Sequence, residues 1–290
     1  MPELFETHRG SVKAWECDSF GHFTVAYYFD RFSDASAAAL AALREGKLLP
    51  AGQHWQAVAY TARFQQELRS GDGLHIESGV IAADPQHLSL GHKVMNSTSG
   101  EVAATVEETL VPAPGSASLA PAFLAGLEAG RLSWPAAKRQ ESAVPDGGKG
   151  FMTSARDVVR AWEVDEGGGL ALPFYIHRTS AGSGQLLASV GLSADYLRSA
   201  GRGFATFEIR LSLHEPRPRA GERLRLESAL QRLGTSSLEM LHRLYEASSG
   251  CLVASASQSG AHFDLATRRS TPIPQALREK AAGFLVGQRN

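Results

Sequence analysis

The sequence contains two related copies of one segment. Shifting residues 12–33 by 147 positions places them on residues 159–180, and nine of the 22 positions are then identical. These positions are Val12/Val159, Ala14/Ala161, Trp15/Trp162, Glu16/Glu163, Asp18/Asp165, Gly21/Gly168, Tyr28/Tyr175, Arg31/Arg178 and Ser33/Ser180. A second block, residues 71–104, matches residues 221–254 at a shift of 150. Two agreeing blocks predict two copies of one domain, paired within one chain as single-domain homologues pair from two chains.

Composition and charge narrow the classes of partner. At 290 residues the chain has room for two domains, each with its own core. A net charge of -1 gives no electrostatic reason to expect nucleic acid or a membrane surface as partner. The first ten residues lack the apolar segment of a secretion signal, and no stretch approaches the roughly 18 apolar residues of a membrane span. We therefore expect a cytoplasmic protein. Cys17 and Cys251 are not equivalent in the copies, which argues against a duplicated disulfide or metal site.

Both copies show the same order of expected elements. Strand-like runs at Gly10–Glu16 and Asp157–Glu163 precede helical stretches at Tyr27–Leu43 and Phe174–Leu192. Four strand-like segments with short turns then follow in each copy. They are Gln56–Gln65, Leu74–Ala83, Leu88–Asn96 and Val102–Val111, then Gly203–Leu213, Arg223–Leu233, Leu238–Ala247 and Cys251–Phe263. Short turns between consecutive strands indicate an antiparallel meander.

These elements predict an α+β fold of two tandem domains, each a central helix wrapped by an antiparallel sheet. We place the domains at residues 1–111 and 151–290, joined by a linker of residues 112–150 that contains one short helix. The second central helix carries three glycines, each costing about 1 kcal/mol relative to alanine. We expect it to be shorter or looser than the first.

A motif between the opening strand and the helix of the first copy contains the candidate catalytic residues. Residues 15–28 read WECDSFGHFTVAYY, in which Asp18, Gly21 and His22 form a D-x-x-G-H pattern and Tyr28 follows inside the helix. This pattern resembles the opening of hotdog-fold thioesterases of the 4-hydroxybenzoyl-CoA thioesterase type. Together the two halves resemble a tandem hotdog protein of that family.

The resemblance implies hydrolysis of an acyl thioester. In this family the loop aspartate, here Asp18, acts as nucleophile or general base, and a backbone N–H at the helix start polarises the thioester carbonyl. The chemistry is physically coherent, because a helix N-terminus supplies free N–H donors and a positive dipole end where the oxyanion develops. Thr24–Ala26 fall at that position. No metal or other cofactor is implied.

The resemblance also yields a set of candidate site residues. Asp18 and His22 are the catalytic candidates. The substrate-binding candidates are Gly21, Phe23, Thr24, Val25, Tyr28, His54 and Trp55. Other interpretations stay open: Asp-x-x-Gly segments often only cap turns, a turn histidine is often a local hydrogen-bond partner, and the His54-Trp55 pair has an equally good structural explanation. Thr24 and Val25 stand where the family usually has two asparagines.

The second copy departs from this pattern. It keeps Asp165, but Gly169 replaces His22 and Gly167 replaces Phe20. A glycine-rich loop of this kind is either a flexible gate or a degenerate site, and we favour a degenerate site at Asp165. The expected substrate is therefore an acyl-CoA or acyl carrier protein thioester, hydrolysed at one working site. Alternatives are a hotdog enoyl-CoA hydratase or dehydratase, whose D-x-N-P-x-H pattern is absent, and a non-catalytic acyl-thioester-binding protein. Association of two chains into a homodimer is left open.

Overall fold

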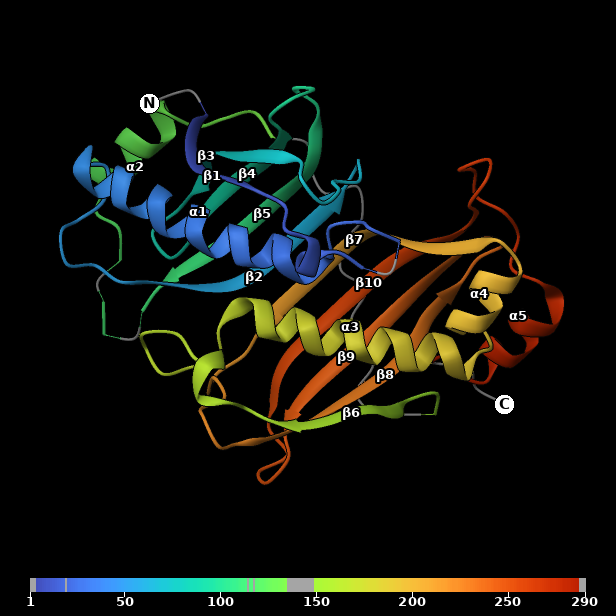
Figure 1. Cartoon of the computed structure of the whole chain (residues 1–290). Coiled ribbons are helices and arrows are strands. Elements are labelled where there is room, and N and C mark those ends of the chain that lie inside the picture. Colours follow the sequence, from blue (N-terminus) through green and yellow to red (C-terminus); the bar gives the residue numbers. More distant parts are fainter. Residues whose placement is uncertain (1–3, 19, 114, 117, 135–148, 287–290) are drawn as a thin grey trace. The chain divides into compact units, whose positions relative to one another are not determined.

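The computed structural model describes residues 4–18, 20–113, 115–116, 118–134 and 149–286. The chain divides into two compact units, unit 1 within residues 1–139 and unit 2 within residues 140–290. Each unit has one long helix and five antiparallel strands (Figure 1). The α+β class predicted from the sequence is therefore confirmed.

Unit 1 has the strand order β1-β3-β4-β5-β2. Its elements are β1 (Phe5–Ser11), the 3-10 turn η1 (Ala14–Glu16), α1 (Val25–Glu45), β2 (Trp55–Phe64), β3 (Gly73–Ala83), β4 (Leu88–Asn96), β5 (Val102–Pro112) and α2 (Pro121–Ala129). Helix α2 lies in the segment that the sequence assigns to the linker. Its Leu127 is buried in a core cluster with Leu40 and Leu43 of α1, so this part of the segment packs on unit 1.

Unit 2 repeats the same plan with the strand order β7-β10-β9-β8-β6. Its elements are β6 (Met152–Val158), the 3-10 turn η2 (Ala161–Glu163), α3 (Leu172–Ser189), α4 (Ala194–Ser199), β7 (Arg202–Leu213), β8 (Arg223–Leu233), β9 (Ser237–Glu246), β10 (Leu252–Asp264) and α5 (Gln275–Ala282). Helix α3 has 18 residues against 21 for α1, so it is the shorter helix, as expected.

Two sequence-based expectations need correction. The opening strands β1 and β6 begin and end five residues before the expected Gly10–Glu16 and Asp157–Glu163. In unit 2 the expected run closes in η2 instead, and in unit 1 it closes in η1. This turn forms because the buried Glu16 carboxylate accepts the Lys13 N–H at 2.8 Å. The four later strands are also not one meander. Only β3, β4 and β5 follow in order, whereas β2 pairs with β5 at the opposite sheet edge.

Consequently the connection from β2 to β3, residues 65–72, is a crossover and not a hairpin turn. It runs past the start of α1, where the Phe23 N–H donates to the Leu68 carbonyl at 2.8 Å. The equivalent crossover of unit 2 runs past the start of α3, where the Leu170 N–H donates to the Pro218 carbonyl at 2.7 Å. Each crossover therefore brings side chains of its own to the loop that precedes the central helix.

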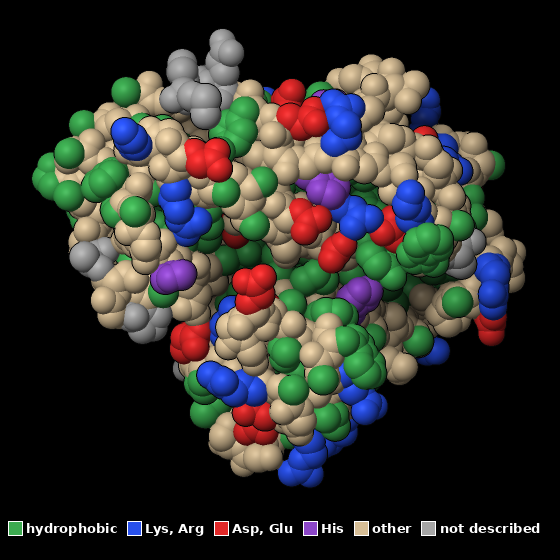
Figure 2. Space-filling view, turned by 60° about the vertical axis from the view of Figure 1, so that its left-hand side comes forward, with side chains coloured by type: hydrophobic (Ala, Val, Ile, Leu, Met, Phe, Trp, Pro, Cys, Tyr) green, Lys and Arg blue, Asp and Glu red, His purple; other side chains and the backbone are tan. Residues whose placement is uncertain are grey.

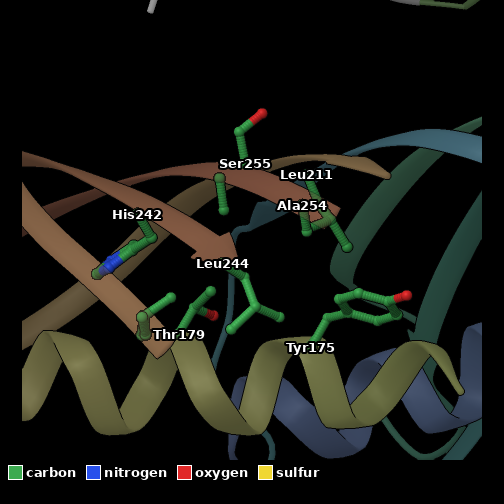
Figure 3. A pocket seen from close by; sticks show the side chains of 9 residues that line it. Tyr175, Thr179, Leu211, His242, Leu244, Ala254 and Ser255 are labelled. Atoms are coloured by element: carbon green, nitrogen blue, oxygen red, sulfur yellow. The ribbon is translucent and has the colours of Figure 1, made fainter. Parts of the chain in front are cut away.

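The central helices pack differently against their sheets. In α1, Phe32 stacks on His92 of β4 with ring centroids 6.3 Å apart. The equivalent position in α3 is Thr179, which lines a gap beside His242 (Figure 3). The gap is too narrow to hold a water molecule, because α3 lies close to the sheet. A Cβ atom at Gly182 would come within 2.4 Å of the Leu226 side chain, so this glycine permits the close approach.

A row of buried and partly buried polar side chains crosses each sheet on the face toward the helix. In unit 1 every strand contributes one member, and hydrogen bonds link neighbours. The members, in strand order across the sheet, are Thr7, Ser78, His92, Glu108 and Tyr60. Unit 2 repeats the row with Ser154, Ser228, His242, Gln258 and Thr206, joined by Ser183 of α3. Burial lowers the pKa of His242 to about 4, so this imidazole is neutral near pH 7. The equivalent histidines of the two copies thus share one structural use.

The surface shows charges of both signs. Acidic and basic side chains are interspersed on the face drawn in Figure 2, in keeping with the net charge of -1. Within the ranges that the model describes, no helix has the length and apolar character needed to cross a membrane.

Candidate active site

The Asp18 loop of unit 1 is a tight turn closed on itself by hydrogen bonds. The Asp18 N–H donates to the His22 carbonyl at 2.8 Å, and the Gly21 N–H donates to the Asp18 carbonyl at 3.0 Å. Gly21 has a φ of 77°, in the left-handed region that disfavours other residues. The loop can therefore present its aspartate in one defined position.

The two carboxylate oxygens of Asp18 have different surroundings. Oδ1 accepts the N–H groups of Phe20 at 2.8 Å and His22 at 3.0 Å, which is the turn-capping role that the sequence leaves open. Oδ2 lies 3.9 Å from Nδ1 of His22, too far for a hydrogen bond. With 41% of its side chain exposed, Asp18 can cap the turn and still present one oxygen to a substrate.

His22 connects the loop to the crossover. Its Nε2 lies 3.1 Å from Oε2 of Glu67 and 3.1 Å from Nη2 of Arg69. The exposed Phe20 ring stacks over the imidazole with centroids 6.4 Å apart. The histidine is thus held between the loop aspartate and a glutamate that sequence reasoning did not select.

Helix α1 begins directly beside the base of this loop. The Thr24 N–H and hydroxyl both donate to the Glu16 carbonyl, at 2.9 and 3.2 Å. Glu16 itself forms a buried ion pair with Arg31 in the second turn of the helix. The N–H groups of Val25 and Ala26 are in the first turn, where a helix offers no acceptor, and no other described residue accepts a hydrogen bond from them. They are free to bind a developing oxyanion.

Aromatic side chains pack against one another in the core at the start of α1. Phe23 packs on Tyr28 with centroids 4.5 Å apart, and Tyr28 contacts Phe64 of β2 at 5.2 Å. Both Phe23 and Tyr28 are buried. In unit 1 these two candidates lie in the core, and a direct contact with substrate stays a prediction.

The corresponding loop of unit 2 keeps the turn and changes its chemistry. Asp165 Oδ1 caps the turn through the N–H groups of Gly167 and Gly169, at 2.9 and 3.2 Å. Its Oδ2, however, forms an ion pair with Nη2 of Arg217 at 2.7 Å. Arg217 occupies the crossover position of Glu67, so the charge beside the loop is reversed.

The start of α3 also differs. Pro173 occupies the position of Ala26 and has no N–H to donate. Gly169 pairs with Arg219 of the crossover as His22 pairs with Arg69, but brings no imidazole. Unit 2 therefore lacks the histidine and one of the two free N–H donors, and its aspartate is held by an arginine.

Substitutions in the crossover change the partner of a buried tyrosine hydroxyl. Burial raises the pKa of Tyr28, and the Leu68 N–H bond to its hydroxyl offsets part of this effect. In unit 2, Pro218 takes the place of Leu68 and has no N–H. The Tyr175 hydroxyl instead meets the guanidinium of Arg217. Burial raises the pKa of Tyr175 to about 12, and the charge and hydrogen bond of Arg217 offset part of this effect.

We expect the two tyrosines to respond differently to loss of the hydroxyl. Tyr28→Phe should lower the free energy of unfolding of unit 1 by about 1 kcal/mol, because the Leu68 N–H is left unpaired. Tyr175→Phe should change that of unit 2 by less than about 0.5 kcal/mol, because Arg217 keeps its ion pair with Asp165 and is not left unpaired. Hydrogen exchange of α1 and α3 measures the units separately. Equal destabilisation by the two substitutions would contradict this assignment.

Comparisons with known proteins identify the family. The family model described as the thioesterase-like superfamily matches residues 12–125 and 159–281, which is most of the chain. The chain belongs to the thioesterase-like superfamily. Its enzyme class is thioester hydrolase, as predicted. None of the curated protein sequences matches it.

Solved structures resemble this thioesterase-like chain along its length. A Lactobacillus plantarum protein described as an oleoyl thioesterase aligns over 90% of this chain and 96% of its own, with a TM-score of 0.70 and 13% identity. The 12:0-ACP thioesterase of Umbellularia californica gives a TM-score of 0.65 over 90% of this chain and 94% of its own, at 13% identity. An acyl-ACP thioesterase of Bacteroides thetaiotaomicron VPI-5482 also gives 0.65, over 89% and 97%, at 9% identity. At these identities the likeness concerns the fold, and the predicted tandem hotdog fold is confirmed.

His54 and Trp55 lie apart from the other candidates of this thioesterase-like chain. Trp55 packs against the core cluster at the C-terminal end of α1. Strand β2 runs from there back to Phe64, which reaches the N-terminal end of α1. A 10-residue strand spans roughly 33 Å, so these two side chains are not beside the Asp18 loop. Their role in binding an acyl group stays a prediction.

Glu67, Arg69 and Arg217 are the site residues that sequence reasoning missed. The signal was present, since at the shift of 150 Glu67 aligns with Arg217 and Leu68 with Pro218 just before the second matching block. A reversal of charge at equivalent positions of two related copies indicates a change of local chemistry. The charge reversal bears on the site only because the crossover places these positions beside the loop.

Proposed function

We propose that the chain hydrolyses an acyl-CoA or acyl carrier protein thioester to the free acid and the thiol, and that this reaction takes place at the Asp18 loop. The observation that carries the proposal is the difference between the two units. In unit 1, one carboxylate oxygen of Asp18 accepts no hydrogen bond from a described residue, and the first helix N–H groups likewise have no acceptor among the described residues. In unit 2, an arginine holds the aspartate and a proline removes a donor.

Asp18 supplies the oxygen chemistry in one of two ways. Its carboxylate attacks the thioester carbonyl carbon, the C–S bond breaks to release the thiolate, and water then hydrolyses the resulting anhydride. Alternatively, Asp18 removes a proton from a water molecule that attacks the same carbon. Both routes consume one water and release one carboxylate and one thiol. The N–H groups of Val25 and Ala26 are the candidate donors to the oxyanion in either route.

His22 is best explained as a positioning residue. Its Nε2 contacts Glu67 and Arg69, and its backbone N–H donates to Asp18 Oδ1. These contacts favour one orientation of the loop, and a protonated imidazole would add a positive charge near the carboxylate. Gly21 contributes the backbone turn and Thr24 the anchored helix start. The Asp165 loop is then a degenerate site that keeps the fold of the loop.

An assay on the full chain with a panel of acyl-CoA and acyl carrier protein thioesters tests this function. We expect release of free thiol, followed with a thiol-reactive dye. A hotdog hydratase would instead change the absorbance of an enoyl-CoA without releasing thiol. Binding of the thioesters without either reaction would identify a non-catalytic protein and contradict the proposal.

A further inference from the structure

Trp15 and Trp162 are large apolar side chains that the fold does not bury. Each is 74% exposed in the middle of its 3-10 turn, η1 or η2. Burying an aromatic ring of this size normally contributes strongly to stability. Two equivalent indoles left in solvent therefore point to a contact outside the fold.

The other large residues that the two copies share have structural uses. Val12/Val159 and Tyr28/Tyr175 are buried, and Glu16/Glu163 form ion pairs with Arg31/Arg178. The tryptophans were retained through the same divergence without such a contact. A structural explanation that covers the other shared side chains does not cover this pair.

A basic side chain accompanies each indole. Lys13 and Arg160 stand two residues before Trp15 and Trp162, and both are exposed. Trp15 is three residues before Asp18, which limits the distance between their Cα atoms to about 11 Å. Unit 1 therefore has an exposed aromatic side chain and an exposed cation close in the chain to the proposed catalytic loop.

Building on the thioesterase function proposed above, we infer that Trp15 and Lys13 bind the nucleotide end of a coenzyme A thioester. An exposed indole stacks on a purine base, and a lysine ammonium is a point charge suited to phosphate. The pantetheine arm then leads to the thioester at Asp18. A carrier-protein thioester carries no purine, so this contact selects acyl-CoA as the substrate class. A single indole beside a cation suits such a ligand better than a protein interface, which needs on the order of 1,000 Å² and an apolar centre.

Two substrates with the same acyl group test the inference. Trp15→Ala should raise KM for the acyl-CoA on the order of tenfold with kcat unchanged, because a base-stacking contact is lost. The acyl-N-acetylcysteamine thioester lacks the nucleotide, so its kcat/KM should not change. Lys13→Ala should raise KM for acyl-CoA as well, more at low salt than at high salt. The matched control Trp162→Ala should leave KM within about twofold, because it flanks the Asp165 loop.

Each other result overturns the inference. An unchanged KM for acyl-CoA in Trp15→Ala would do so, as would an equal loss with both substrates or a larger effect of Trp162→Ala. A change in sedimentation behaviour without a change in KM would assign Trp15 to a contact between copies of the chain. Hydrolysis of the N-acetylcysteamine thioester by the unaltered protein does not depend on the nucleotide site. If that thioester, acyl-CoA and the acyl carrier protein thioester are all inert, the proposed function fails as well. If any of them is hydrolysed while the Trp15 results above are not obtained, only the nucleotide contact is wrong.

Discussion

Replacing Asp18 by asparagine should lower kcat for thioester hydrolysis by about 10²-fold or more. The amide keeps an Oδ1 atom that accepts the two backbone N–H bonds of the turn, so the loop should keep its conformation. What is lost is the negative charge needed for attack on the carbonyl or for removing a proton from water. Thiol release at saturating substrate measures the effect, and circular dichroism checks the fold.

Asp165→Asn is the matched control because this residue caps an equivalent turn. We expect it to retain most of the activity, since Arg217 already holds its carboxylate. If each single variant lost about the same part of kcat and only the double variant were inactive, both loops would catalyse hydrolysis. Normal activity of Asp18→Asn would remove the basis of the proposed mechanism.

Ala26→Pro should also lower kcat by about 10²-fold, because it removes one of the two N–H groups available to an oxyanion at the start of α1. Proline is tolerated in the first turn of a helix, and unit 2 carries Pro173 at the same position of α3. The substitution therefore copies a backbone that this chain already forms. The measurement is again kcat, with KM expected to change less.

The reciprocal variant Pro173→Ala controls for effects on helix stability. It should leave kcat unchanged, because the aspartate beside it stays paired with Arg217. Hydrogen exchange of α1 checks that Ala26→Pro folds. If the folded variant retains full kcat, the Ala26 N–H does not stabilise the oxyanion. The donor would then have to be sought elsewhere in the loop.

Much of the architecture was accessible from the sequence because it depends on local pattern. Strands β4 and β8 have the predicted bounds, and six other strands differ from prediction by one residue at one or both ends, since alternation and turn residues mark strand ends closely. Strands β1 and β6 lie five residues before the predicted runs. The pairing of β2 with β5 was not accessible. Sequence order favours pairing with β3, and only packing around the helix decides which edge a strand joins.

The site was predictable in part for the same reason. Asp18, Gly21 and His22 belong to one local motif, and the structure places them in one closed turn. Glu67 and Arg69 lie beside this turn because the β2–β3 connection is a crossover that passes it. The hairpin expected from the sequence would not have placed these two residues there. The contrast between Glu67 and Arg217 is visible in the sequence, but its position beside the catalytic candidate depends on the strand order.

The buried polar row has a further consequence for how each sheet is assembled. Its members come from all five strands of a unit. In unit 1 each bonds to the next across the sheet, and in unit 2 Ser183 of α3 links His242 to Gln258. A strand that slipped by one residue would turn its member to the opposite face and leave the neighbouring polar groups buried without partners. The row therefore disfavours every shifted register of the strands, whatever it contributes to the free energy of unfolding of the native fold. Unit 2 keeps the row although Gly169 stands where unit 1 has His22, so this constraint on strand register does not depend on the residues of the loop.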